Sequence, residues 1–177
     1  MGSDQNGDVE SGLKQFLADR RSQVESGWNR SLPFGDYVSD RWDKAALLGF
    51  GEGTSVYDNV VVLGDVSVGK NTWIGPQVVL DGAGGLTVGD FCSISAGVQI
   101  YSHDSVRWAL SMGQDEIEYS PTKIGSGVYL GPNVVVAKGV TIGDRCVIGA
   151  NSVVLSDIPS GHVAYGNPCQ VSREVES

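Results

Sequence analysis

Basic residues, proline and long apolar runs are all scarce in this sequence. Lysine and arginine total 12 against 21 aspartate and glutamate, for a net charge of −9, which argues against binding to nucleic acid or an anionic membrane surface. Only 6 of the 177 residues are proline although 25 are glycine, so the bias is not that of collagen or of a disordered chain. No apolar run reaches the roughly 18 residues of a transmembrane segment, and no signal peptide opens the chain.

Cysteine is also sparse, and its pattern favours a reducing compartment. The three cysteines stand at positions 92, 146 and 169. They are odd in number and lack the spacing of metal ligands. We therefore expect free thiols in a single-domain cytoplasmic protein without a metal site.

Valine and glycine are abundant, and they follow a regular pattern. A branched aliphatic residue recurs every six positions, apart from two extra residues in Gly82–Gly85 and a long interruption after Ile100. The positions are Val56, Val62, Val68, Ile74, Leu80, Val88, Ile94, Ile100, Ile124, Leu130, Val136, Ile142, Ile148 and Val154. This period is typical of a parallel β-solenoid, in which three hexads close one coil of about 18 residues and successive coils stack on one another.

The repeat divides the chain into three segments. We expect the solenoid over residues 46–159, with an extended loop at 102–122, and a C-terminal tail over residues 160–177 that folds back over the coils. In residues 1–45 the apolar side chains fall at roughly helical spacing. We expect that segment to cap the first coil, whose strand edges would otherwise be exposed.

Three features together resemble a known enzyme family. They are the hexads, the histidine in "GVQIYSHDS" and the run "VVVAKGVTIGDRCVIGANSVVLSDIPSGHVAYGNPC". Over about residues 32–173 the chain resembles the hexapeptide-repeat acyltransferases, above all the maltose/galactoside-type and O-antigen-type sugar O-acetyltransferases. The resemblance implies an all-β fold, a left-handed parallel β-helix with a short N-terminal helical cap and an extended loop. It also implies acetyl-CoA as cosubstrate and a homotrimer with active sites between subunits. Gamma-class carbonic anhydrases share the solenoid but need three histidines around zinc, and this chain has two.

The resemblance places the catalytic centre at His103. In the family this histidine is the general base that removes a proton from the acceptor as it attacks the thioester. Asp104 and Glu118 are candidates to orient its imidazole, although a solvated loop charge is the alternative for each. The oxyanion donor of the family is a backbone N–H at the position of Pro132, which has none, so Gly131 is predicted in its place.

The same resemblance predicts a coenzyme groove. The matching positions are Tyr129, Ala150, Asn151 and Ser152 for the pantetheine arm, and Arg173 for the 3′-phosphate. One phosphate contact of the family is missing, because Leu155-Ser156 replaces the expected Thr-Lys pair. Lys138 or Arg145 could compensate, and a solvated surface charge is the alternative for both.

For the acceptor, the N-terminal segment offers Asp36, Asp40 and Asp43, of which Asp36 is favoured. Trp108 and Glu118 of the loop are further predicted contacts, and Trp108 could equally hold the loop down. The function implied is transfer of an acetyl group from acetyl-CoA to a sugar hydroxyl in surface-polysaccharide biosynthesis. The alternative is N-acylation of an amino sugar carried on a nucleotide. A non-enzymatic solenoid, such as an ice-binding protein or a scaffold, would need a flat repetitive outer face, which the varied outward residues do not provide.

Overall fold

The computed structural model describes residues 4–176 and divides the chain into two compact units, with the boundary between Asp40 and Arg41. The first unit is helical. It contains α1 (Asp4–Trp28) and α2 (Phe34–Val38), joined by contacts in which the Arg20 guanidinium donates to the Tyr37 carbonyl at 3.1 Å and the Tyr37 hydroxyl accepts from the Leu32 N–H at 2.8 Å. The helix predicted for this segment from the spacing of its apolar residues is thus confirmed.

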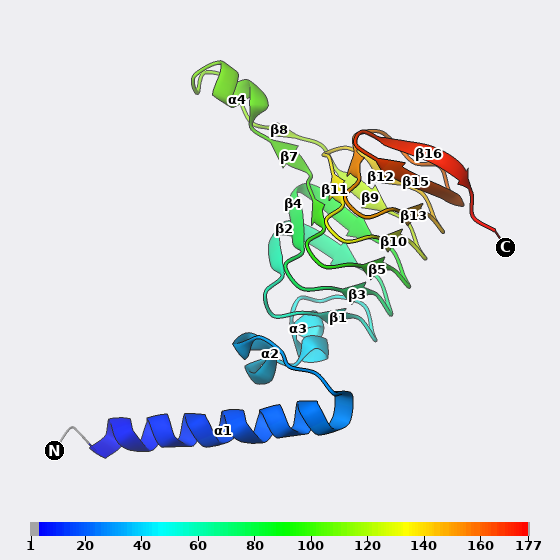
Figure 1. Cartoon of the computed structure of the whole chain (residues 1–177). Coiled ribbons are helices and arrows are strands. Elements are labelled where there is room, and N and C mark those ends of the chain that lie inside the picture. Colours follow the sequence, from blue (N-terminus) through cyan, green and yellow to red (C-terminus); the bar gives the residue numbers. More distant parts are fainter. Residues whose placement is uncertain (1–3, 177) are drawn as a thin grey trace. The chain divides into compact units, whose positions relative to one another are not determined.

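The second unit is a parallel β-helix of about six coils (Figure 1). One face is a sheet of seven strands in the order β1 (Ser55–Val56), β3 (Trp73–Ile74), β5 (Ser93–Ile94), β10 (Tyr129–Leu130), β13 (Val147–Ile148), β15 (His162–Gly166) and β16 (Cys169–Glu174). A second sheet has the order β12 (Thr141–Ile142), β9 (Thr122–Ile124), β4 (Val79–Val88), β6 (Gln99–Ile100), β11 (Val135–Val136) and β14 (Val153–Val154), with β2 (Val61–Val68) paired to β4.

The register of the strands follows the hexapeptide period. Val56 pairs with Ile74 and Leu130 pairs with Ile148, each 18 residues apart. Ile74 pairs with Ile94, 20 residues on, because Gly82–Gly85 lengthens that coil by two residues. β2 and β4 run through a corner of the coil as continuous strands at this point, with an irregularity between Gly64 and Val66.

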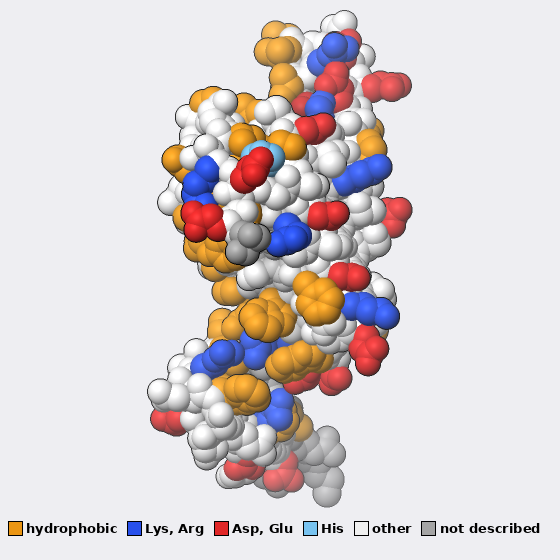
Figure 2. Space-filling view, turned by 90° about the vertical axis from the view of Figure 1, so that its right-hand side faces the viewer, with side chains coloured by type: hydrophobic (Ala, Val, Ile, Leu, Met, Phe, Trp, Pro, Cys, Tyr) orange, Lys and Arg blue, Asp and Glu red, His pale blue; other side chains and the backbone are white. Residues whose placement is uncertain are grey.

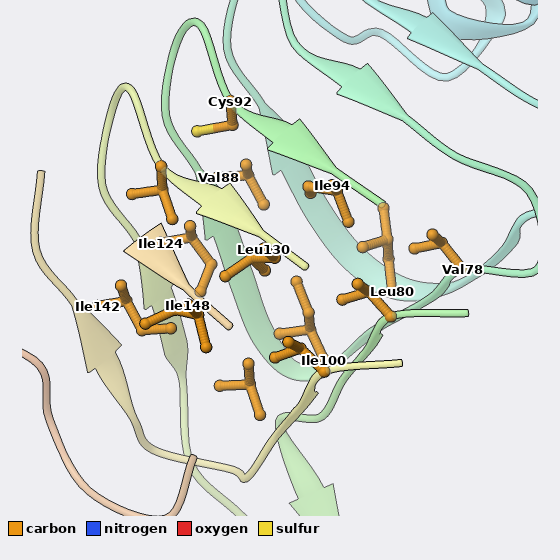
Figure 3. Close-up of a cluster of buried hydrophobic side chains, with 14 of the residues drawn as sticks. Val78, Leu80, Val88, Cys92, Ile94, Ile100, Ile124, Leu130, Ile142 and Ile148 are labelled. Atoms are coloured by element: carbon orange, nitrogen blue, oxygen red, sulfur yellow. The ribbon is translucent and has the colours of Figure 1, made fainter. Parts of the chain in front are cut away.

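The core is a column of aliphatic side chains from successive coils. All 14 hexad positions except Val62, which is half-buried, are buried. Figure 3 draws 14 of the core residues inside the coils and labels ten of them, Cys92 among these. Like stacks on like, so each coil buries an apolar face that it could not bury alone. Cys92, Cys146 and Cys169 are buried free thiols, and burial raises the pKa of Cys92 and Cys169.

The first coil is closed by α3 (Arg41–Leu47), which packs on β1. Ala45 is buried with the solenoid core, and the Lys44 ammonium donates to the carbonyl oxygens of Tyr57 at 3.1 Å and Asp58 at 2.5 Å. The predicted boundary at residue 45 therefore falls inside a helix that belongs to the β-helix unit. Whether α1 and α2 cap the same end stays a prediction.

The C-terminal segment is more regular than the predicted tail. β15 continues the first sheet parallel to β13, and β16 returns antiparallel to β15. Ala164 and Cys169 are buried by this hairpin. The outer edge of β15, the last parallel strand of this sheet, is therefore paired with β16.

Candidate active site

The predicted loop at 102–122 is a hairpin arm that projects from the β-helix (Figure 1). Its two strands, β7 (His103–Asp104) and β8 (Glu118–Tyr119), pair antiparallel, and the short helix α4 (Val106–Leu110) lies beyond them. His103 stands opposite Tyr119, and their rings stack with centroids 5.9 Å apart. We call residues 103–119 the arm.

The imidazole of His103 is held by a buried carboxylate. Its Nδ1 lies 2.5 Å from Oδ2 of Asp81, whose side chain is fully buried, while the His103 side chain keeps 32% of its surface exposed. Asp81 was not singled out from the sequence. It fills the orienting role that was predicted for Asp104 or Glu118, and that prediction is wrong.

The two-residue insertion in β4 explains why Asp81 reaches His103. Glycine at position 84 lets the chain pass close to the next coil, since a Cβ there would lie 2.3 Å from the Ser102 carbonyl oxygen. The Gly84 N–H donates to the Ser102 hydroxyl at 2.8 Å. Asp81 in turn accepts from the Ser102 N–H at 2.9 Å and from the Ala83 N–H at 3.0 Å. These backbone N–H groups hold the Asp81 carboxylate in addition to its contact with His103.

These bonds also set the charge state of Asp81. Burial by itself raises the pKa of its carboxyl group, but the N–H groups of Ser102 and Ala83 and the imidazole of His103 outweigh that effect. The net result is a pKa below the usual range. Asp81 is therefore an anion that accepts the proton on Nδ1 of His103 and leaves Nε2 free to accept another.

An open pocket of about 440 Å³ adjoins His103 at the base of the arm. Its walls combine apolar and polar side chains. They are Tyr101, His103, Asp104, Ser105, Val106, Val135, Ala137 and Lys138. The imidazole of His103 therefore faces a pocket of a size that can admit a small molecule.

Lys138 lies at the centre of a group of charges beside the pocket. Its ammonium contacts the Asp104 carboxylate at 2.8 Å and also the carboxylate of Glu118, which in turn pairs with Arg107 at 2.8 Å. From the sequence, Lys138 was a candidate contact for a coenzyme phosphate. The structure instead pairs it with two carboxylates of the arm.

Gly131 cannot serve as the predicted oxyanion donor. Its N–H donates to the Ile148 carbonyl at 2.9 Å, as part of the hydrogen-bond ladder between coils. A Cβ at this position would lie 2.6 Å from the Ala150 nitrogen. Glycine is needed here for close packing of coils, and the prediction of a catalytic role is wrong.

The predicted coenzyme residues divide into exposed and buried ones. Tyr129 is 41% exposed on β10, and Ala150 and Asn151 are exposed at the turn before β14. Ser152 faces the core, where its hydroxyl donates to the Gly149 carbonyl at 2.7 Å and accepts from the Gly166 N–H. The hydroxyl of Ser152 is thus engaged inside the coil, which corrects its assignment to the groove.

The remaining predicted residues lie outside the pocket. Arg173 is on β16, where it bonds to the Glu174 carbonyl, and it stays a predicted phosphate contact. Trp108 belongs to α4, does not line the pocket and lies near Gly113 within the arm, and both of its alternative roles stay predictions. Asp36 is buried in the first unit, and its contact with the acceptor stays a prediction.

Two further properties concern the whole described chain. Within residues 4–176, no cluster of three or more histidine, cysteine, aspartate or glutamate side chains is placed to bind a metal ion. None of the helices described combines the length and the apolar character of a membrane span.

On the face of the β-helix in Figure 2, acidic and basic side chains are interspersed, and no continuous basic patch is visible.

Family models match both halves of the solenoid. The model described as bacterial transferase hexapeptide (six repeats) matches residues 121–156, and the model described as hexapeptide repeat of succinyl-transferase matches residues 65–102. WcaF of Escherichia coli K12, which carries the name of a colanic acid biosynthesis acetyltransferase, is 34% identical over 144 residues, covering 76% of this chain and 75% of WcaF. The chain belongs to the hexapeptide-repeat acetyltransferases. The fold expected of that family, a left-handed parallel β-helix, is confirmed.

Two other members of the family bear on the site. Galactoside O-acetyltransferase of Escherichia coli K12 is 32% identical over 129 residues, and the match covers 62% of this chain but less than two thirds of that protein, 64%. A hexapeptide-repeat acetyltransferase from Vibrio cholerae O1 biovar eltor, solved in complex with acetyl coenzyme A, is 28% identical. It covers 94% of this chain and 90% of its own, with a TM-score of 0.69.

Proposed function

We propose that this protein transfers the acetyl group of acetyl-CoA to a hydroxyl of a sugar, with His103 as the general base. The observation that carries the proposal is the His103–Asp81 pair: a partly exposed imidazole, 2.5 Å from a fully buried carboxylate, faces an open pocket. Membership in an acetyltransferase family supplies the reaction class. Two relatives, whose names include galactoside and colanic acid biosynthesis, support a sugar acceptor and a role in surface-polysaccharide biosynthesis.

The pair has the arrangement that general-base catalysis requires. Nδ1 of His103 donates to Asp81, so Nε2 carries the free lone pair. When Nε2 takes the acceptor's proton, the imidazolium is stabilised by the anionic carboxylate beside it. Asp81 itself keeps its negative charge throughout, because its hydrogen bonds favour the ionised form.

The proposed reaction has two steps, in which one proton moves from the acceptor to His103 and then to the leaving thiolate. The acceptor oxygen forms a bond to the thioester carbonyl carbon as its proton moves to Nε2 of His103. The tetrahedral intermediate collapses with cleavage of the carbon–sulfur bond. The departing thiolate takes the proton from Nε2, which yields the acetyl ester and coenzyme A and restores the neutral imidazole. A thioester is reactive enough that this scheme needs no metal ion.

The proposed binding of acetyl-CoA is supported by the relatives and by the exposed residues predicted to line the coenzyme groove. The Vibrio cholerae protein binds acetyl-CoA and aligns with nearly the whole chain. Tyr129, Ala150 and Asn151 offer an exposed surface on neighbouring coils, and Arg173 offers a cation for the 3′-phosphate. Because acetyl-CoA is a cytoplasmic metabolite, we also propose that the protein acts in the cytoplasm.

The charges around the pocket favour a neutral acceptor. Lys138 and Arg107 are matched by Asp104 and Glu118, so the buried carboxylate of Asp81 leaves the site negative. Further acids follow on the arm at Asp115 and Glu116, and a pyrophosphate-linked substrate would be repelled. A neutral sugar encounters no such repulsion. We therefore favour O-acetylation of a neutral sugar over N-acylation of a nucleotide-linked amino sugar.

The open pocket supports the predicted homotrimer. One chain supplies the wall that bears His103, and the arm beyond it exposes large apolar side chains, with Leu110 81% and Met112 92% exposed. Apolar surface of this kind marks a contact with another chain. The proposal is that a second copy of the chain closes the pocket and supplies the groove for the coenzyme.

The test is an acetyl-transfer assay on matched acceptors. Pairs of sugars that differ only in a hydroxyl or an amine are offered with acetyl-CoA, and release of the free thiol is followed. We expect the largest kcat/KM for a neutral sugar hydroxyl. If a nucleotide-linked amino sugar is preferred by an order of magnitude, the O-acetylation proposal is wrong and the N-acylation alternative stands.

A further inference from the structure

Lys138 joins the solenoid to both strands of the arm. Its ammonium contacts Asp104 on β7 at 2.8 Å and also contacts Glu118 on β8, and only 20% of its side chain is exposed. Asp104 and Glu118 are cross-strand partners in the register of the arm. We propose that Lys138 is a positioning residue that holds the arm, and with it His103, in the reactive orientation. The inference rests on the proposed function.

The backbone around Lys138 is fixed to the coils. Ala137 donates its N–H to the Val154 carbonyl at 3.0 Å, and the Gly139 N–H donates to the hydroxyl of Thr122 at 3.0 Å. The ammonium thus reaches the arm from a rigid turn of the solenoid. The coil fixes the backbone of Lys138, and the two carboxylates of the arm hold its ammonium.

The base of the arm is bonded to the coils at Ser102 and Ser120: the Gly84 N–H donates to the Ser102 hydroxyl at 2.8 Å, and the Gly139 N–H donates to the Ser120 carbonyl at 3.2 Å. The Ser120 N–H donates to the Ser102 carbonyl at 2.8 Å and so closes the base of the hairpin. From there His103 extends toward Asp81, and the strands of the arm are only two residues long. A two-residue strand pair has little stability of its own. A bridging cation that touches both strands therefore restrains the direction of His103.

The three charges reinforce one another. The hydrogen bond from Lys138 lowers the pKa of Asp104, with a further contribution from the Val106 N–H, and the two carboxylates raise the pKa of Lys138. Both shifts favour the ionised forms of Asp104 and Lys138, and Arg107 adds a second cation beside Glu118. An ammonium that already has two carboxylate partners is poorly suited to bind a coenzyme phosphate. The positioning role therefore replaces the phosphate contact considered from the sequence.

The two roles make opposite kinetic predictions for Lys138→Met. A positioning role lowers kcat about 10-fold or more with little change in the KM for acetyl-CoA, because misplacement of a base affects the chemical step. A phosphate contact raises the KM for acetyl-CoA and makes the variant indifferent to loss of the 3′-phosphate. The assay compares acetyl-CoA with 3′-dephospho-acetyl-CoA for the wild type, Lys138→Met, Lys138→Arg and the control Lys123→Met, which removes an exposed lysine on β9. We expect Lys138→Arg to restore most of the rate.

Hydrogen exchange supplies a readout that does not depend on the acceptor. In Lys138→Met the amides of residues 103–119 should exchange faster than in the wild type and in Lys123→Met, with the rest of the β-helix unchanged. If Lys138→Met does not fold, Asp104→Asn combined with Glu118→Gln removes the same contacts from the arm and should give the same result. If the wild type transfers acetyl to no acceptor, the proposed function fails, but the exchange experiment still tests the arm. Unchanged exchange, or a raised KM for acetyl-CoA with kcat intact, would overturn the inference.

Discussion

The contact between Asp81 and His103 makes Asp81→Asn the most informative single substitution. Asparagine has nearly the shape of aspartate, and its side-chain oxygen can still accept one of the two backbone N–H bonds from Ser102 and Ala83. Oδ2 of Asp81 accepts from both the Ser102 N–H and Nδ1 of His103, so an asparagine oxygen at this position keeps both bonds and loses only the bond from the Ala83 N–H. The substitution therefore removes the negative charge, and the imidazolium that forms when His103 takes a proton no longer has an anion beside it.

The magnitude follows from the two roles of the carboxylate. Loss of general-base catalysis is worth about 10²- to 10⁴-fold in rate, which corresponds to about 3–5 kcal/mol of transition-state free energy. The loss in kcat should lie in that range, with the KM for acetyl-CoA nearly constant, because Asp81 does not line the pocket. Loss of one buried hydrogen bond lowers the free energy of unfolding by about 1–3 kcal/mol.

The assay follows release of the coenzyme A thiol in the presence of the preferred sugar, with Asp65→Asn as the control. Asp65 is exposed on β2, in a neighbouring coil. Nitrogen-15 chemical shifts of the imidazole report the tautomer directly and should show the proton of the neutral ring on Nδ1 in both proteins, so that a lower rate is due to the missing charge. A folded Asp81→Asn protein that keeps more than half of the wild-type kcat would refute the reasoning, since the orienting carboxylate would then be dispensable.

Three further outcomes follow from the contacts described above. The pKa values of Asp81 and Asp104 are lowered in the folded protein. The two carboxylates therefore stabilise the fold fully above the unfolded carboxyl pKa of about 4, and this contribution is lost as the pH falls through the lower folded pKa values. Denaturant titrations should show a free energy of unfolding that drops below that pH, and drops less in Asp81→Asn. Gly84→Ala places a Cβ 2.3 Å from the Ser102 carbonyl oxygen and should cost about 1–3 kcal/mol of stability, whereas Gly12→Ala on α1, where the space is open, should cost nothing; equal melting curves for the two variants would contradict the close approach of the coils. Sedimentation equilibrium should give a species of three chains, and an active monomer at assay concentration would exclude a site shared between subunits.

The fold could be predicted from the sequence because a solenoid is specified locally. Each hexad carries its own aliphatic residue, and identical positions stack on one another, so Val56, Ile74 and Ile94 could be assigned to the core without any long-range information. The register between coils needed only the period and the two-residue insertion. The hairpin formed by β15 and β16 could not be predicted in this way, because the segment has no hexads and its pairing is antiparallel.

The site was predictable only in part. His103 could be located because its loop, at the interruption of the repeat, resembles the histidine-bearing loop of the hexapeptide-repeat acyltransferases. Asp81 could not, since it lies at an insertion that breaks the period, and its proximity to His103 depends on how the lengthened coil turns at Gly84. A carboxylate one coil before the histidine, within the irregular stretch, was the signal available in the sequence.

The wrong assignments share a physical cause. Gly131 and Ser152 were placed by matching positions in a family, but the hydrogen bonds of a coil already occupy their N–H and hydroxyl groups. Asp104, Glu118 and Lys138 were each considered singly. Their mutual neutralisation depends on the pairing of β7 with β8, which the sequence does not reveal.

The most direct test of the central claim is the turnover of His103→Ala with acetyl-CoA and the preferred sugar. The account predicts a folded protein with unchanged oligomeric state and a kcat lowered by at least about 10²-fold, the scale of a lost general base. His162→Ala, at the other histidine of the chain, should retain the wild-type kcat, since His162 bonds through Nδ1 to the Ser160 carbonyl and lies outside the pocket. A His103→Ala protein that keeps more than half of the wild-type turnover would contradict the account.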